Sequence, residues 1–329
     1  MHFFRKTNID FIGKRRIWYY VSTFVTMAGI VWALFRGIEY GIDFAGGTEV
    51  QLQFQKNVGI EEVRASLDKA AIRGAEVKYY GKDESGVLIR VREGAQGAQA
   101  GSEATKKVMD AVASGFQSNK AELMQEQHIG PKIGAELRQK AFLAVFFTCI
   151  VILIYLTFRF RFVYGMGAVI AIVHDVLVAF AFAVICNGLV PWLNLEMNST
   201  LLAAFLTIVG FSVNDTVIIF DRIREDQRKY KGQTLKEIMN RAINETLPRT
   251  IITSGTVFLT LLVLFIWGGE VLRGFAFTML IGVITGTYSS IFVASAIAYD
   301  WLERDTKKTS RVTVGGRKQS ASKNVPATA

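Results

Sequence analysis

Residues 198–226 read NSTLLAAFLTIVGFSVNDTVIIFDRIRED, and they place one carboxylate inside an apolar run. From Thr200 to Phe220 this run has the length of the roughly 20 residues with which a helix crosses a hydrocarbon core. Asp215 is its only ionisable side chain. Because a charge at that depth costs roughly 2.5 to 3.5 kcal/mol on insertion scales, we expect Asp215 either to be protonated or to have a partner.

The whole chain has the composition of an α-helical multi-pass membrane protein. Of its 329 residues 51% are hydrophobic, the mean hydropathy is positive, and the apolar residues gather in blocks between charged stretches. Six transmembrane helices are predicted, at Ile17–Phe35, Ala141–Phe158, Val163–Ile185, Thr200–Phe220, Ile251–Gly268 and Gly274–Tyr299. Small residues at helical spacing in the sixth span (Gly282, Gly286, Ser289, Ser290) and at the start of the third (Gly165, Gly167) predict close helix packing.

Lys and Arg are distributed unevenly around these spans. The first 16 residues carry five of them, residues 221–250 carry eight and the tail seven, whereas residues 186–199 and 269–273 carry none and one. The positive-inside rule therefore predicts that both termini are cytoplasmic. Because the basic residues flank spans and do not form one patch with aromatic residues, the net charge of +10 does not indicate nucleic-acid binding.

The segment between the first two spans is predicted to be an extracytoplasmic domain. We divide the chain into a cytoplasmic N-terminus (1–16), a first transmembrane helix (17–35), the outer domain (36–140), transmembrane helices two to six (141–303) and a basic disordered cytoplasmic tail (304–329). In the outer domain we expect strands at Thr48–Phe54, Glu76–Tyr80, Val87–Arg92 and Glu122–His128, helices at Ile60–Ile72 and Glu103–Phe116, and a flexible loop at Gly94–Gly101. The order βαββαβ is that of an α+β ferredoxin-like domain.

The sequence contains no evident catalytic or metal-binding cluster. The outer domain has no cysteine, and His128 has no second His or Cys beside it. Cys149 and Cys186 fall in or at the end of spans, where a small apolar role is favoured over a disulfide or a metal site. We therefore predict that the chain is not an enzyme and binds no cofactor or metal, and that the outer domain has a binding or docking role.

Two glycine-containing segments join the outer domain to the membrane. Gly46 and Gly47 follow the first span and permit a tight backbone conformation at the membrane face. Residues 130–137, GPKIGAEL, precede the second span. Both segments are either stiff corners or hinges that carry motion from the helices to the domain, and the sequence does not separate these interpretations.

The third span holds a second polar pair, His174 and Asp175, near the middle of the membrane. Adjacent residues on a helix point about 100° apart, so only one of the two is directed at a given neighbouring helix. The pair is either a structural hydrogen-bonding pair between helices or a secondary part of a proton relay.

Arg249 is the natural partner for Asp215. It opens the fifth predicted span, after Pro248, and consecutive spans joined by a cytoplasmic loop tend to pack as neighbours. An Asp–Arg pair would keep Asp215 ionised, and separation of the pair would let it take a proton. The alternative is that Arg249 is an ordinary boundary arginine whose charged group extends to the interface.

Six motifs in this chain resemble the SecD/SecF family of bacterial protein-export membrane proteins. They are DFAGGT at 43–48, GPKIGAEL at 130–137, VHD at 173–175, GFSVNDTVIIFDRIRE at 210–225, NETLPRT at 244–250 and GTYSSIFVA at 286–294. The resemblance covers nearly the whole chain apart from the tail after about Lys308.

The resemblance implies a six-helix unit of the resistance-nodulation-division superfamily in the bacterial inner membrane. Such a subunit acts with SecD to help the SecYEG channel export unfolded polypeptides, with protons as the coupling ion. By the same resemblance Asp215 carries the proton and Arg249 regulates it, with a further carboxylate from SecD. Two other functions stay open: a passive scaffold in which Asp215 only joins helices, and small-molecule or lipid efflux, which usually needs a larger outer domain.

Overall fold

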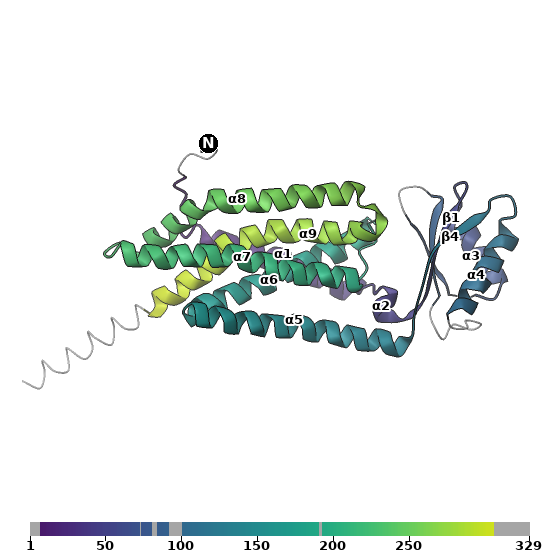
Figure 1. Cartoon of the computed structure of the whole chain (residues 1–329), viewed down its shortest axis with the longest axis horizontal. Helices are drawn as coiled ribbons and strands as arrows, with labels where there is room; N and C mark the ends of the chain where they lie inside the picture. Colours follow the sequence, from purple (N-terminus) through teal and green to yellow (C-terminus); the bar gives the residue numbers. More distant parts are fainter. Residues whose placement is uncertain (1–6, 73, 81–83, 92–100, 191–192, 306–329) are drawn as a thin grey trace, which may run out of the picture.

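The protein is an elongated bundle of long helices with a small α+β domain at one end, in a computed structural model (Figure 1). The structure describes residues 7–72, 74–80, 84–91, 101–190 and 193–305. Residues 94–100 of the predicted flexible loop and 306–329 of the predicted tail therefore lie outside the described residues.

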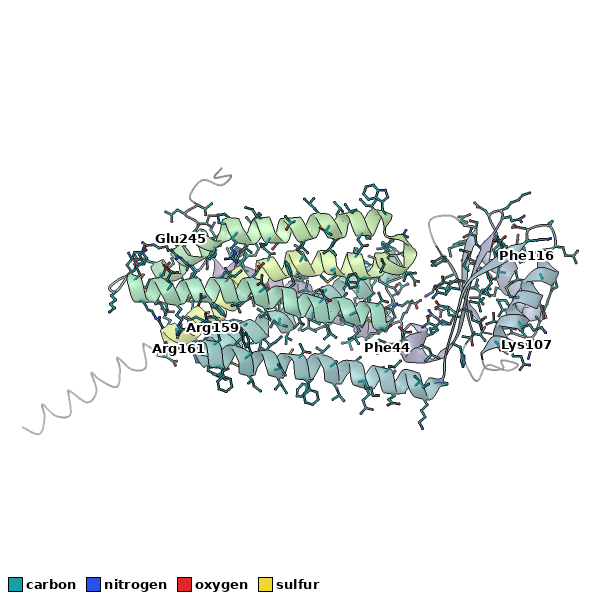
Figure 2. All side chains as sticks on the ribbon, in the orientation of Figure 1. Phe44, Lys107, Phe116, Arg159, Arg161 and Glu245 are labelled. Carbon is teal, nitrogen blue, oxygen red and sulfur yellow. The ribbon has the colours of Figure 1, made fainter. Side chains whose placement is uncertain are left out.

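Six helices in the described part are long and apolar enough to cross a membrane, which confirms the predicted number of spans. They are α1 (Arg15–Arg36), α5 (Pro131–Arg159), α6 (Phe162–Leu189), α7 (Ser199–Lys229), α8 (Leu235–Trp267) and a last helix that begins as α9 (Gly269–Ser289), passes through a π-helical turn, η2 (Ser290–Ala294), and ends at Asp305. Figure 2 shows Arg159 and Arg161 at the end of the bundle away from the sheet, and Phe44 at the end next to it.

Helix α8 begins earlier than the hydrophobic pattern predicts. A capping box starts it: Thr234 Oγ1 accepts the backbone N–H of Glu237 at 3.3 Å, and the Glu237 carboxylate accepts the N–H of Thr234 at 2.9 Å. Pro248 and Arg249 therefore lie inside the helix, and the expectation that Arg249 opens the membrane span stays a prediction. Pro248 has no N–H, so the helix continues there with one backbone hydrogen bond fewer.

Helices α6, α7 and α9 form the centre of the bundle, where small residues permit close approach. A Cβ atom added to Gly282 of α9 would lie 2.2 Å from Cγ1 of Ile208 on α7. One added to Gly167 of α6 would lie 3.0 Å from the carbonyl oxygen of Ala294. These contacts fit the small-residue spacing of the sequence. Helices α1, α5 and α8 leave much of their apolar surface exposed, as faces toward lipid or a partner do.

The outer domain has the element order βαββαβ. Its strands are β1 (Gly47–Phe54), β2 (Glu76–Tyr79), β3 (Gly86–Val91) and β4 (Ala121–Ile129), and its helices are α3 (Ile60–Lys69) and α4 (Ser102–Gly115). The sheet order is β2-β3-β1-β4, and every neighbouring pair is antiparallel. One face of the sheet packs on α3 and α4 around Val50, Leu52, Val63, Leu67 and Val108, which are fully buried. The other face is turned toward the bundle (Figure 1).

A short helix, α2 (Ile42–Ala45), lies between α1 and β1 and packs against the start of α5. Gly46 and Gly47, which follow it, have positive φ angles of 76° and 132°. A Cβ on Gly46 would lie 2.7 Å from Cα of Pro131 at the start of α5, so only glycine fits there. The two glycines thus form a closely packed corner, and their action as a hinge stays a prediction.

Candidate functional site

Asp215 lies fully buried in the middle of α7, where its carboxylate faces α8 and α9. Its Oδ2 accepts a hydrogen bond from Ser254 Oγ of α8 at 3.2 Å. Ser254 Oγ accepts in turn from Thr287 Oγ1 of α9 at 2.7 Å. The other carboxylate oxygen, Oδ1, is buried and has no hydrogen-bond partner among the described residues. Asp215 therefore presents one satisfied oxygen and one bare oxygen inside the membrane part of the chain.

Asp175 on α6 is equally buried, but both of its oxygens are used. Ser212 Oγ of α7 and Ser289 Oγ of α9 each donate to its Oδ2 at 2.6 Å. Its Oδ1 lies 3.0 Å from Nδ1 of His174, which donates in the tautomer that carries its proton there. Asp175 thus joins α6, α7 and α9, and the His174 ring beside it lies 6.2 Å from the ring of Tyr288 on α9.

Hydroxyl groups fill the space between α7 and the last helix near both carboxylates. Thr216 Oγ1 and Ser290 Oγ are hydrogen-bonded at 2.8 Å. Ser290 opens the π-helical turn η2, and its carbonyl oxygen accepts from Ser295 Oγ at 2.8 Å. Single π turns inside α-helices occur frequently at functional sites. The interior of the bundle is therefore polar at this level and apolar above and below it.

Arg249 does not contact Asp215 in this structure. Its side chain is exposed on α8, and within the described part of the chain it forms no ion pair within 4.0 Å. Its backbone carbonyl accepts a hydrogen bond from Thr253 Oγ1 at 3.0 Å. The structure therefore brings Ser254, and not Arg249, to Asp215, and the relay roles of these residues stay predictions.

Sequence reasoning did not identify Arg90 and Glu196, although both are almost fully buried and charged. Arg90 of β3 and Glu196 of the α6–α7 loop form an ion pair of 2.6 Å. Burial opposes the positive charge of Arg90, but the carboxylates of Glu196 and Glu49 outweigh this effect and raise its pKa. The available signal was one charged residue inside an apolar strand, VLIRV at 87–91, and one inside a short loop, LNLEMN at 193–198.

Comparisons with known proteins agree with this architecture. A family model described as "Protein export membrane protein SecD/SecF, C-terminal" matches residues 108–304, which include Asp175, Asp215 and Arg249. A second, "SecD/SecF GG Motif", matches residues 31–58, which include Gly46 and Gly47. The chain belongs to the SecD/SecF family. The resemblance read from the sequence is thereby confirmed, and the chain is a multi-pass protein of the bacterial inner membrane.

Relatives match over nearly the full chain. Protein translocase subunit SecF of Rhodothermus marinus is 39% identical over 300 residues, 91% of this chain and 95% of the relative. That of Magnetococcus marinus is 40% identical over 296 residues, 90% of this chain and 92% of the relative.

Two solved SecDF structures share the fold. The crystal structure of SecDF from Thermus thermophilus superposes with a TM-score of 0.79 at 32% identity and covers 90% of this chain. SecDF in a super-membrane-facing form gives a TM-score of 0.67 at 31% identity and covers 94%. This chain spans only 39% and 41% of those two chains, respectively.

Proposed function

We propose that this chain is a proton-gradient-coupled accessory subunit of the Sec protein-export machinery. It acts with SecD to promote translocation of unfolded polypeptides through the SecYEG channel across the inner membrane. The observation that carries the proposal is the bare Oδ1 of the buried Asp215. The relatives named SecF are translocase subunits, and the proposal assigns no enzymatic reaction to the chain.

A carboxylate uses a proton gradient by alternating between its charged and neutral forms. A proton that crosses the membrane releases roughly 2.3 kcal/mol per 100 mV, enough to shift a two-state element more than tenfold. In the arrangement seen here, Oδ1 of Asp215 is the atom at which a proton would bind, because Oδ2 already accepts from Ser254. The hydroxyls of Ser254 and Thr287 then stabilise either form, because a hydroxyl can donate or accept.

Arg249 supplies the second state. It lies five residues before Ser254 on α8, and its side chain is free of other ion pairs within the described residues. A rotation or shift of α8 that brings the guanidinium to Oδ1 would hold Asp215 ionised. Return of Arg249 to the surface would restore the present arrangement and leave Oδ1 open to a proton.

The hydrogen bonds of His174 and Asp175 favour a structural role over a secondary proton relay. Asp175 accepts hydrogen bonds from α7 and α9 with both oxygens engaged. A fully satisfied buried carboxylate stabilises one arrangement of helices. We therefore assign Asp175 to the contacts that hold α6, α7 and α9 together as one body, which moves relative to α8.

The outer domain belongs on the export side, with both termini in the cytoplasm. The basic residues Arg159 and Arg161 lie at the opposite end of the bundle from the sheet, as the positive-inside rule requires (Figure 2). The strand order and antiparallel pairing support a ferredoxin-like domain. SecD would supply much of the chain length by which the solved SecDF chains exceed this one.

The test is proton uptake by right-side-out vesicles that contain this chain, SecD, SecYEG and a trapped unfolded substrate, because protons then move inward as the polypeptide moves outward. The wild-type complex is expected to show proton uptake that depends on both substrate and gradient. Asp215→Asn, which keeps the size and one hydrogen-bonding oxygen, is expected to abolish it. Unchanged uptake in this variant would leave Asp215 as a residue that only joins α7 to α8.

A further inference from the structure

The loop between α6 and α7 is tied to the underside of the outer sheet by a buried charge cluster. The Glu196 carboxylate accepts from Arg90 Nη2 of β3 at 2.6 Å and from Lys78 Nζ of β2 at 2.8 Å. Glu196 and Arg90 are each only 3% exposed. Arg90 also pairs with Glu49 of β1 at 2.8 Å. One carboxylate of the membrane part thus binds cations from two strands of the outer domain.

Lys78 occupies the place that a metal ion would take in this cluster. Carboxylate oxygens of Glu39, Glu76 and Glu196 lie close enough together to hold a cation. The ammonium of Lys78 lies 3.0, 2.8 and 2.8 Å from them, respectively. Burial lowers the pKa of Lys78, but the carboxylates outweigh this effect and raise it overall. The largest of their contributions comes from Glu196. The cluster therefore contains its own cation, and its role is to hold elements together.

A second set of contacts holds the first residue of α7. The Oδ2 atom of Asp43 in α2 accepts the backbone N–H of Ser199 at 2.8 Å and also its hydroxyl. The Oδ1 atom of Asp43 accepts from Gln127 of β4 at 3.0 Å. Just before α7, Met197 exchanges backbone hydrogen bonds with the segment that leads into α2, at Glu39 and Gly41. The outer end of α7 is thus linked to β4 through Asp43, and the loop before it is bonded to β2 and β3 through Glu196.

Helix α7 links these contacts to Asp215. It is continuous from Ser199 to Lys229 and has no internal proline. Asp215 lies 16 residues from Ser199, or about 24 Å at 1.5 Å per residue. A hydrogen-bonded helix moves over that distance as one body, so a displacement of Asp215 along or around the helix axis also displaces Ser199 and the loop that carries Glu196.

We propose that Arg90 and Glu196 are positioning residues that couple α7 to the outer domain, so that the domain follows α7 when Asp215 changes its protonation state. This inference rests on the proposed proton-coupled function. Loss of Arg90 leaves Glu196 with Lys78 alone, and loss of Glu196 leaves Arg90 paired only within the sheet, with Glu49 and Glu76. In either case the buried link between β3 and the α6–α7 loop is removed, and a buried charge loses its shortest ion pair. The outer domain would then be oriented less strictly, although its own core between the sheet and α3 and α4 stays intact.

The test measures domain orientation and export separately. Spin labels are placed at Glu61→Cys on α3 and Val271→Cys at the outer end of α9, in a background that carries Cys149→Ala and Cys186→Ala. Pulsed electron paramagnetic resonance then gives the distance distribution in the assembled complex, and vesicle export gives the gradient-dependent rate.

The variants are Arg90→Met, Glu196→Met and the double variant. Arg64→Met is the matched control, because Arg64 forms an exposed ion pair with Glu61 on the same domain. Since Glu61 is also a labelling position, Arg64→Met is measured for export in a chain without the two labels.

Each single variant is expected to broaden the distance distribution and to reduce gradient-dependent export to less than half of the wild-type value, while Arg64→Met exports normally. The double variant is expected to be no worse than the worse single one, because both changes remove the same contact. A narrow, unchanged distribution in Arg90→Met or Glu196→Met would overturn the proposal. So would a broad distribution with full export, or a double variant whose loss is the product of the two single losses.

Asp215→Asn separates this inference from the proposed function. If Asp215→Asn exports with full gradient dependence, the proposed function fails, whereas the distance measurement still reports whether Arg90 and Glu196 fix the domain. If Asp215→Asn loses that dependence and Arg90→Met keeps it, only the coupling role is wrong.

Discussion

Ser254 of α8 donates a hydrogen bond to Asp215 of α7 at 3.2 Å, on the carboxylate oxygen opposite the one that is left bare. A carboxylate held on one side only can gain or lose a proton on the other without breaking the contact that positions it. The same serine receives the hydroxyl hydrogen of Thr287. Helices α7, α8 and α9 are therefore connected through one chain of oxygens that ends at the site of proposed protonation.

Removal of the Ser254 hydroxyl is expected to weaken proton coupling while the bundle still assembles. In Ser254→Ala the Oδ2 atom of Asp215 loses its hydrogen bond as well, so both buried oxygens are left without a partner among the described residues, at a cost of about 1 to 3 kcal/mol. Gradient-dependent export should fall several-fold and the thermal midpoint of the purified complex should drop by a few degrees. Thr256→Ala is the matched control, since among the described residues the exposed hydroxyl of Thr256 bonds only to its own helix, at the carbonyl of Thr253. Equal export by both variants would contradict the role given to Ser254.

Arg249 substitutions test the second state of the switch. Arg249→Met is expected to abolish gradient-dependent export, because Asp215 then has no cation with which to form its ionised state. Arg249→Lys should be intermediate at best, since an ammonium lacks the planar fork that binds both oxygens of a carboxylate. The control is Arg241→Met, which removes a cation that stacks on Tyr230, 4.0 Å from the ring centre. If all three variants export alike, Arg249 is an ordinary boundary arginine.

Close packing of α7 against α9 makes Gly282 sensitive to substitution. A Cβ there would lie 2.2 Å from Cγ1 of Ile208, so Gly282→Ala should destabilise the bundle by about 1 to 3 kcal/mol. Ile208→Ala removes that Cγ1 atom, so Gly282→Ala should be less destabilising in an Ile208→Ala chain than beside Ile208. At Gly210 of α7 an added Cβ meets nothing within 4 Å, so Gly210→Ala should leave the thermal midpoint unchanged or raise it. The thermal midpoints in detergent decide this prediction, which fails if Gly282→Ala and Gly210→Ala behave alike.

Accessibility labelling tests the orientation in the membrane. Single cysteines at Glu61 of α3 and at Lys231, between α7 and α8, are both at exposed positions. In the Cys149→Ala, Cys186→Ala background, an impermeant thiol reagent added outside intact spheroplasts should label the first and not the second. Labelling of both from the same side would contradict six spans with cytoplasmic termini.

The sequence predicted those features that depend on local pattern. Apolar run length identifies six spans, alternation identifies the strands of the outer domain, and a lone charge identifies Asp215. The start of α8 was missed because the apolar window begins at Ile251, although the capping box of Thr234 and Glu237 was a readable signal.

Partners between distant elements could not be read from the sequence. Which hydroxyl meets Asp215 depends on the rotation of α8 about its axis, and Ser254 is one of many hydroxyls in that helix. The Arg90–Glu196 pair joins residues 106 positions apart, and nothing in either local pattern specifies the other. Arg249 was predicted to pair with Asp215 from its charge and from the packing of consecutive spans, but in the structure its side chain is exposed on α8.

The central claim is tested most directly by export from inverted vesicles that contain SecYEG, SecD and either this chain or its Asp215→Asn variant, each with and without an ionophore that collapses the proton gradient. The account predicts that the ionophore slows export in the wild-type complex severalfold and has no effect in the variant, whose rate equals that of the uncoupled wild type. Immunoblots of the vesicles confirm equal amounts of assembled complex. Export by Asp215→Asn at the wild-type rate, with the same loss on addition of ionophore, would contradict proton coupling through Asp215.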